Sequence, residues 1–353
     1  MKPLRVALAD DSSFIRRAVA RLLAGEPTIA VVGLAASGEE LLEHLDDWKP
    51  EAVVLDLSMP GMGGLRTLDA LRERGGCAVL ILSTHSRKDA PLTVEALHRG
   101  AADFIDKQQY SLVDFDALRG VLVERLHEIT SREMPLPAPE SLRAVEAGGA
   151  EEPLASPAPG SIELVAIGAS AGGPPAIEKI LADLGAAVGV PIAVVQHMPG
   201  AFTRSFAERL NAYLPLRVKE AAHDELLSAD VVYIAPGGIH LRIESAHDRL
   251  RAVLSAFPED ATHRPSVDEM FNSAARATRG RMVAVLLTGM GLDGAAAMVH
   301  LAQSGIHTIA QDRASSAVFG MPRAAIEAGG AQEVLALDAI GPRLLQLVAT
   351  GER

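Results

Sequence analysis

The segment 167–173, Ile-Gly-Ala-Ser-Ala-Gly-Gly, constrains the fold more than any other feature of this chain, because it places a serine on a turn flanked by glycines. The apolar residues 162–167 before it are typical of a buried parallel strand. Pro174 and Pro175 after it suit the first turn of a helix that continues to residue 184. Glycines permit a sharp turn, so we expect Ser170 Oγ to be exposed at the carboxyl end of a strand.

Strands and helices alternate on both sides of a proline-rich joint. In the first half, strands are predicted at 4–9, 29–35, 52–57, 78–82 and 103–105, and helices at 13–24, 39–45, 65–73, 90–99 and 115–128. In the second half, strands are predicted near residues 162, 192, 231, 282 and 308, and helices at 176–184, 201–211, 266–278, 294–303 and 339–349. The pattern predicts two α/β domains with doubly wound parallel sheets, and a hairpin at 239–243 and 250–255 adding antiparallel strands at one edge of the second sheet.

The joint lies between residues 131 and 160, where six of the chain's 21 prolines fall among Ala, Gly and Glu. Such a composition is semi-extended and buries little, so we interpret the segment as an interdomain linker. An ordered arm lying along one domain is the alternative, and a short helix around 140–146 is compatible with either. The expected domains are therefore 1–130 and 161–353.

Composition narrows the class of protein. The net charge of −12 argues against a nucleic-acid-binding protein, which needs a basic face. The single cysteine, Cys77, cannot form an internal disulfide, which fits a reducing cytosol. No apolar run approaches the roughly 20 residues of a membrane span, and the first residues do not resemble a signal peptide. We therefore expect a cytoplasmic protein without membrane insertion.

Acidic side chains gather at strand ends in the first domain. Asp10 and Asp11 follow its first strand and Asp56 ends its third, while Ser83 and Lys107 end the fourth and fifth. The carboxyl ends of strands in an open α/β sheet meet at one crevice, so these residues should converge. Carboxylates repel one another, which favours a hard divalent cation, most plausibly Mg²⁺. The cluster then suits transfer of a phosphoryl group to Asp56; the alternative is that the acidic residues only cap helices.

In the second domain, a serine, a histidine and an aspartate each follow a separate predicted strand. Ser170 follows the strand near 162, His197 follows 191–196, and Asp293 lies just beyond 281–288. A hydroxyl nucleophile, an imidazole base and a carboxylate that fixes the imidazole tautomer are the three groups that acyl transfer requires. Their joint placement at the edge of one parallel sheet predicts a catalytic triad.

Each residue also has a simpler interpretation. Ser170 could belong to an anion-binding turn, although no G-x-G-x-x-G spacing or Walker lysine accompanies it. His197 could be a hydrogen-bonded structural histidine, and Asp293 could be the N-cap of the helix 294–303. An α/β-hydrolase order would instead pair Asp293 with His307, but His307 would begin a strand, at the opposite end of the sheet.

Residues 3–128 resemble a response-regulator receiver domain, which has a flavodoxin-like fold, and the likeness includes the segment from Asp56 to Leu65. The resemblance implies that Asp56 is the phosphorylated residue and that Mg²⁺ is held by Asp10, Asp11, Asp56 and the carbonyl of Ser58. It also implies switch roles for Ser83, Phe104 and Lys107. Two residues depart from the family pattern: Gly63 replaces a common aspartate, and Gln108 replaces the proline that commonly follows the lysine.

Residues 161–350 resemble the catalytic domain of the chemotaxis protein-glutamate methylesterases (CheB), which also deamidate receptor glutamines. The matching segments are 167–173, 196–210, 235–238, 264–268, 287–291 with 293–294, and 320–322. The resemblance implies that Ser170 is the nucleophile, His197 the general base and Asp293 the residue that orients it. The amides of Ala171 and Met290 are then the oxyanion donors. Ala171 stands where many members have threonine.

The two resemblances together imply a serine hydrolase, activated by phosphorylation, that demethylates chemoreceptors in chemotaxis adaptation. The expected partners are chemoreceptors and a chemotaxis histidine kinase as the phosphodonor; no cofactor is expected in the catalytic domain. Two other classes of protein remain open. One is a receiver fused to a serine hydrolase with another substrate, and the other is a binding module with a vestigial site. The balance between demethylation and deamidation is left open.

Overall fold

A computed structural model describes residues 2–83, 90–107, 115–130, 162–247 and 249–350. The chain divides into two compact units, Met1–Met134 and Pro135–Arg353, each with its own sheet and core. The expected linker at 131–160, with its short helix, lies outside the described residues, as does Gln108. No helix within the described ranges is long and apolar enough to cross a membrane.

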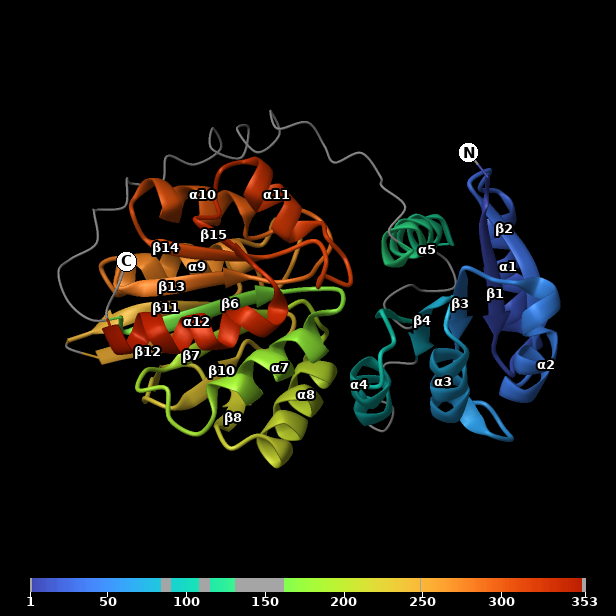
Figure 1. Ribbon diagram of the computed structural model, residues 1–353, viewed down its shortest axis with the longest axis horizontal. Helices are drawn as coiled ribbons and strands as arrows, with labels where there is room; N and C mark the ends of the chain where they lie inside the picture. The colour runs from blue at the N-terminus through green and yellow to red at the C-terminus, as the bar shows by residue number, and fades with distance from the viewer. Residues whose placement is uncertain (1, 84–89, 108–114, 131–161, 248, 351–353) are drawn as a thin grey trace. The chain divides into compact units, whose positions relative to one another are not determined.

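The N-terminal unit is built around a five-stranded parallel sheet in the order β2-β1-β3-β4-β5, which is the flavodoxin-like order. Helices α1 and α5 contact each other, and α2 contacts α3, which contacts α4 (Figure 1). The strands are β1 (Leu4–Ala9), β2 (Ile29–Ala35), β3 (Ala52–Leu55), β4 (Ala78–Ser83) and β5 (Asp103–Asp106). The helices are α1 (Ser13–Ala24), α2 (Gly38–Trp48), α3 (Gly63–Arg74), α4 (Ala90–His98) and α5 (Phe115–Ile129).

The C-terminal unit contains a seven-stranded parallel sheet in the order β15-β14-β13-β6-β7-β10-β8. Its strands are β6 (Leu164–Ala169), β7 (Ile192–Gln196), β8 (Arg217–Glu220), β10 (Val231–Ile234), β13 (Met282–Leu286), β14 (His307–Gln311) and β15 (Glu333–Leu335). The chain runs from β6 to β7 on one side and returns at β13 on the other. The reversal of strand order beside β6 is where such sheets form ligand sites.

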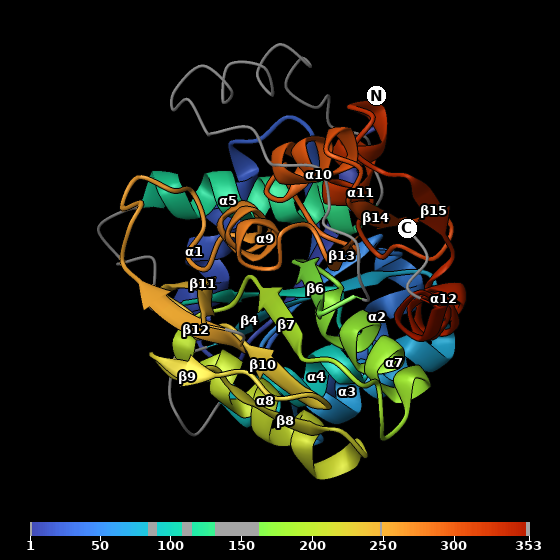
Figure 2. The same cartoon turned by 90° about the vertical axis from the view of Figure 1, so that its left-hand side faces the viewer.

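Helices cover both faces of this sheet (Figures 1 and 2). One face carries α7 (Gly173–Leu184), α8 (Gly200–Tyr213) and α12 (Leu337–Thr350). The other face carries α9 (Val267–Ala277), α10 (Ala295–Gln303) and α11 (Met321–Glu327). Aliphatic residues of β6, β7 and β13 are buried between the two helix layers, which explains why these strands are apolar except for Gln196 at the end of β7.

The predicted hairpin is present, but it does not extend the parallel sheet. Its strands, β11 (His240–Ala246) and β12 (Arg249–Ser255), form a separate three-stranded antiparallel sheet with β9 (Glu225–Leu226). Strand β11 packs against α9, and its apolar residues Leu241 and Ile243 join the core beneath that helix. The hairpin therefore covers the helix layer, not the edge of the sheet.

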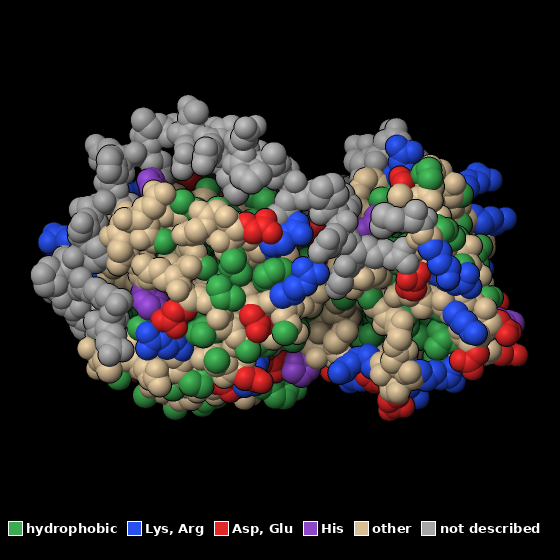
Figure 3. Space-filling model, turned by 45° about the horizontal axis from the view of Figure 1, so that its top comes forward, with side chains coloured by type: hydrophobic (Ala, Val, Ile, Leu, Met, Phe, Trp, Pro, Cys, Tyr) green, Lys and Arg blue, Asp and Glu red, His purple; other side chains and the backbone are tan. Residues whose placement is uncertain are grey.

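The surface carries charges of both signs. On the face in Figure 3, Lys and Arg side chains of the described residues are interspersed with Asp and Glu side chains. This mixture accords with a chain of net charge −12 whose cationic groups are spread out.

Candidate active site and phosphorylation site

The carboxyl end of β6 carries the predicted nucleophile on a turn that glycine makes possible. Gly172, the N-cap of α7, has a φ of 72°, a left-handed conformation that glycine adopts without strain. The amide of Ser170 donates to the carbonyl of Thr288 at 3.1 Å, and its carbonyl accepts from Gly173 N–H at 2.8 Å. The turn is therefore held to the end of β13. Ser170 itself is only 4% exposed, so the expectation of an exposed serine was wrong: the turn lies beneath neighbouring loops.

His197 follows β7 and lies beside this turn. Its amide donates to the carbonyl of Ala169, the last residue of β6, at 3.1 Å. The ring Nε2 lies 2.7 Å from Asp293 Oδ2, and both side chains are 8% exposed. Ring Nδ1 is buried without a hydrogen-bond partner among the described residues. One nitrogen is thus occupied by a carboxylate and the other is left for a proton transfer.

Asp293 is fixed by more than the histidine. Its carboxylate also accepts from Val267 N–H at 2.7 Å, Asp268 N–H at 3.0 Å and Ser266 Oγ–H at 2.9 Å. Burial alone would raise the pKa of Asp293, but the hydrogen bond and charge of His197, with the two amides, hold it well below its usual range. These contacts favour the ionised carboxylate.

The alternative in which Asp293 caps its own following helix does not describe this geometry. The N-cap of α10 is Gly294, which makes no side-chain capping hydrogen bond. Asp293 instead satisfies the first two amides of α9, a helix that begins 26 residues earlier in the chain. His307, the rival histidine, begins β14 at the other end of the sheet and pairs with Glu333 at 2.7 Å.

The loop after β13 presses against the serine turn. A Cβ on Gly289 would lie 2.8 Å from Ser170 Cβ, so only glycine fits there. Thr288 Oγ donates to the carbonyl of Ala171 at 2.9 Å, which ties the two loops together. Among the hydrogen bonds of the described residues, the amides of Ala171 and Met290 donate to no protein acceptor. These are the two amides predicted to bind an oxyanion.

Four residues around this site were not singled out from the sequence. The Gln196 side-chain amide donates to the carbonyl of Ser170 at 2.8 Å, and Ser266 and Asp268 surround Asp293. The pattern Ser266-x-x-Glu269, a capping-box signature, could have located the start of α9. His263, whose ring stacks on that of His197 at 4.2 Å between centroids, also had no sequence signal.

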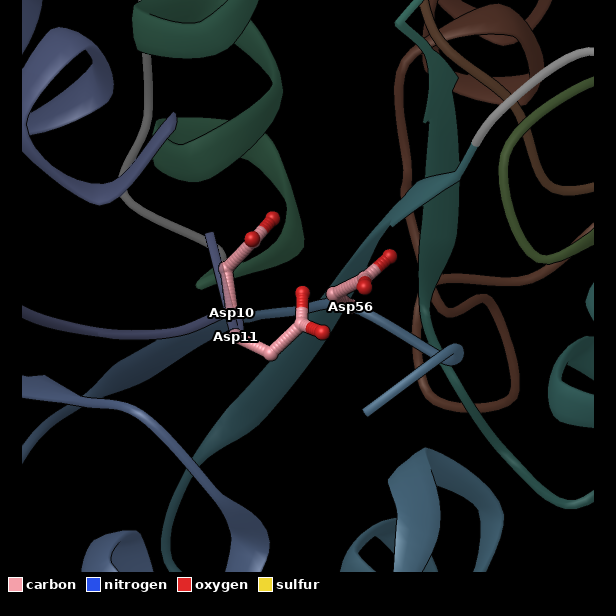
Figure 4. Close-up of side chains that lie close together, drawn as sticks. All are labelled: Asp10, Asp11 and Asp56. Atoms are coloured by element: carbon pink, nitrogen blue, oxygen red, sulfur yellow. The ribbon is translucent and has the colours of Figure 1, made fainter. Parts of the chain in front are cut away.

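The carboxylates of the N-terminal unit converge as predicted (Figure 4). Ligand oxygens of Asp10, Asp11 and Asp56 lie within 4.8 Å of one another, and Asp10 and Asp56 are buried. Lys107 Nζ lies 2.7 Å from Asp10 Oδ2 and 3.0 Å from Asp56 Oδ1. This three-oxygen set has the hard donors that a magnesium ion binds.

The electrostatics of Asp56 agree with that donor set. Desolvation raises the pKa of Asp56, the carboxylates of Asp10 and Asp11 raise it further, and Lys107 opposes them without cancelling the effect. A bound cation would relieve this repulsion. Ser58 is exposed beside the cluster, and Phe104 is buried in β5. Ser83 ends β4, but its side chain lies outside what the structure describes.

Comparison with known proteins identifies both units. The family model described as CheB methylesterase matches residues 165–344, and the one described as response regulator receiver domain matches residues 6–114. Two relatives, from Oleidesulfovibrio alaskensis and Geobacillus kaustophilus, are named protein-glutamate methylesterase/protein-glutamine glutaminase, and each is 37% identical to this chain. The alignments cover 98% and 99% of this chain, respectively, and 99% of each relative. The crystal structure of the Thermotoga maritima CheB methylesterase catalytic domain is 39% identical with a TM-score of 0.52, covering 54% of this chain and all of that one.

Proposed function

This chain belongs to the family of protein-glutamate methylesterases/protein-glutamine glutaminases that carry a response regulator receiver domain, and from that membership we propose its mechanism. It is a chemotaxis hydrolase that converts glutamate methyl esters of chemoreceptors to glutamate and methanol, and receptor glutamines to glutamate and ammonia. Phosphorylation of its receiver domain activates it. The proposed domains are the receiver at 1–130, the linker at 131–160 and the catalytic domain at 161–353.

The observation that carries the mechanism is the 2.7 Å hydrogen bond between His197 Nε2 and Asp293 Oδ2, while Nδ1 has no hydrogen-bond partner in the described part of the chain. Asp293 keeps the proton on Nε2, so Nδ1 is the basic nitrogen. In the proposed first step Ser170 Oγ attacks the ester carbonyl carbon while its proton passes to Nδ1. That proton then leaves with methanol as the C–O bond breaks, and an acyl-enzyme remains.

Deacylation reverses the roles. His197 Nδ1 takes a proton from water, the resulting hydroxide adds to the acyl carbon, and the proton returns to Ser170 Oγ as glutamate is released. The carbonyl oxygen gains negative charge in both steps. The amides of Ala171 and Met290 are the proposed donors to that oxygen, and Gln196 and Thr288 hold the two loops that present them.

In the receiver domain, Asp56 is the proposed phosphoacceptor and Lys107 the residue that holds a phosphoryl oxygen. Asp10, Asp11, Asp56 and the Ser58 carbonyl would hold Mg²⁺, which supplies charge neutralisation for phosphoryl transfer when bound. Ser83 and Phe104 are the proposed switch residues. A chemotaxis histidine kinase is the proposed phosphodonor, and a cytoplasmic location follows from that partnership.

The proposed function is tested by methanol release from methylated chemoreceptors in membranes. Purified full-length protein should release methanol faster when Mg²⁺ and a small phosphodonor such as acetyl phosphate are added. Hydrolysis of generic esters without any release of receptor methanol would contradict the proposed substrate and favour another serine hydrolase.

Asp56→Asn should abolish labelling of the protein by radioactive acetyl phosphate in the presence of Mg²⁺. The substitution removes the attacking oxygen but preserves size, so the buried site remains packed. The matched control is Asp69→Asn, which changes a partly exposed aspartate of α3 that pairs with Arg99. Label retained in the Asp56 variant would assign the phosphoacceptor to another residue.

Removal of residues 1–130 should raise the basal rate of methanol release, or at least not lower it. An inhibitory receiver is coupled to the catalytic domain by a free energy that for such systems is typically about 1–3 kcal/mol, or roughly 5- to 150-fold. The fragment escapes that coupling, whereas the full chain requires phosphorylation. A folded fragment slower than the unphosphorylated full-length enzyme would indicate that the receiver completes the active site.

A further inference from the structure

Helices α9 and α10 cap each other's N-termini. Asp293 directly precedes the cap of α10, yet it accepts from the amides of Val267 and Asp268, the first two residues of α9. Asp268, in the first turn of α9, accepts in turn from the amide of Ala297 in the first turn of α10 at 2.8 Å. Each helix therefore supplies the carboxyl group that satisfies N–H donors of the other.

These reciprocal hydrogen bonds matter because the first amides of a helix have no acceptor within that helix. At α9 the third such amide, that of Glu269, is satisfied by Ser266 Oγ at 3.3 Å. At α10 the N-cap is Gly294, which has no side chain and a φ of 90°. Asp268 is thus the side-chain acceptor that the structure describes for an amide at the start of α10.

The two aspartates that make these reciprocal bonds, Asp268 and Asp293, differ in their electrostatics. Asp293 accepts four hydrogen bonds and is ionised. Desolvation and the neighbouring charge of Asp293 raise the pKa of Asp268 well above its usual range, despite its bonds to the amides of Ala297 and Gly294. The neighbouring carboxylate, that of Glu269, pairs with Arg242 at 3.8 Å.

We propose that Asp268 is a positioning residue for the Asp293–His197 pair: by accepting from the amide of Ala297 it holds the start of α10, and thereby Asp293, against α9. This inference rests on the proposed function. Two adjacent carboxylates would repel each other, whereas a protonated Asp268 accepts from Ala297 with one oxygen and can donate from the other to Asp293. Asp268 orients the residue that orients the base, and it touches no substrate.

Three variants of the full-length protein test the assignment. Asp268→Ala removes the acceptor and frees the loop that carries Asp293; a displacement of about 1 Å there should lower kcat about 10- to 100-fold with little change in KM. Asp268→Asn keeps one acceptor oxygen and one donor group, so it should restore kcat to within about threefold of the wild type. Glu269→Gln is the matched control, because it removes a charge from the same helix turn without touching Asp293.

A spectroscopic readout separates this proposal from the proposed function. The ¹⁵N resonances of the His197 ring, assigned by comparison with His197→Gln, report whether Nε2 carries the proton bound to Asp293 and require no substrate. Asp268→Ala should shift or broaden them, while Asp268→Asn and Glu269→Gln should not. A wild type that shows this resonance but releases no methanol would refute the hydrolase function alone.

Two results would overturn the positioning role, and a third would contradict the protonated form of Asp268. An Asp268→Ala variant with wild-type kcat and an unchanged His197 resonance would show that Asp293 is held without it. Equal losses of kcat in Asp268→Ala and Glu269→Gln would show that the effect comes from the charge of this helix turn and not from the position of Asp293. A loss in Asp268→Asn as large as in Asp268→Ala would mean that the charged carboxylate, not the neutral acid, is required.

Discussion

Ser170→Ala should lower the rate of methanol release from methylated receptors by a factor on the order of 10⁴ or more, because it removes the attacking oxygen. The fold should be retained. The described hydrogen bonds of residue 170 are made by its backbone. Its amide donates to the carbonyl of Thr288, and its carbonyl accepts from the Gln196 side chain and the Gly173 amide. Losing one oxygen from a buried position leaves these bonds and the sharp turn in place.

The measurement is methanol release by the phosphorylated full-length variant, with its circular dichroism and melting temperature compared with the wild type. Ser205→Ala is a matched control, since that hydroxyl donates to the carbonyl of Ala201 within its own helix at 3.2 Å. Ser170→Ala activity above a few per cent of the wild type would mean that another residue attacks the ester.

Much of this arrangement could be predicted from the sequence because parallel strands have local signatures. The apolar segment at 162–167, followed by glycines, indicated both the strand observed at Leu164–Ala169 and the turn after it, and the strands at Leu4–Ala9 and Ile29–Ala35 were predicted with their observed bounds. Since parallel strands bring their carboxyl ends to one edge, side chains far apart in sequence could be placed together. For example, His197 and Asp293 lie far apart in the sequence but follow strands of the same sheet, and their side chains lie together.

The elements that were missed lack such signatures. Strand β8, Arg217–Glu220, lies at the edge of the sheet and has three polar residues out of four, and β9 and β15 contain two and three residues. The hairpin was recognised because its two strands are neighbours in sequence, but its packing against α9 depends on distant residues. The bonds from Asp293 to α9 are equally non-local, so the residues around position 293 offered a cap of the following helix as the alternative to a triad role and gave no sign of α9.

Asp293→Asn should also lower the rate by about 10⁴-fold, because an amide cannot keep His197 in the tautomer that leaves Nδ1 basic. It should in addition destabilise the catalytic domain. Each carboxylate oxygen accepts two hydrogen bonds, Oδ2 from His197 and Val267, Oδ1 from Ser266 and Asp268. Whichever oxygen becomes an NH₂ group then faces donors, at a cost of about 1–3 kcal/mol for an unsatisfied buried group. The loss of activity should exceed what partial unfolding explains at the assay temperature.

The pH dependence of unfolding provides an independent measurement of the same carboxylate. The pKa of Asp293 is lowered on folding, so its stabilising contribution is fully present above the unfolded value of about 3.9 and is lost as the pH falls below it towards the folded value. The difference in unfolding free energy between wild type and Asp293→Asn should therefore be constant near neutral pH and shrink in acid. Wild-type activity with only a lower melting temperature would show that Asp293 is a helix cap and not a catalytic residue. A difference that persists unchanged in acid would show that packing, rather than the buried charge, accounts for the loss of stability.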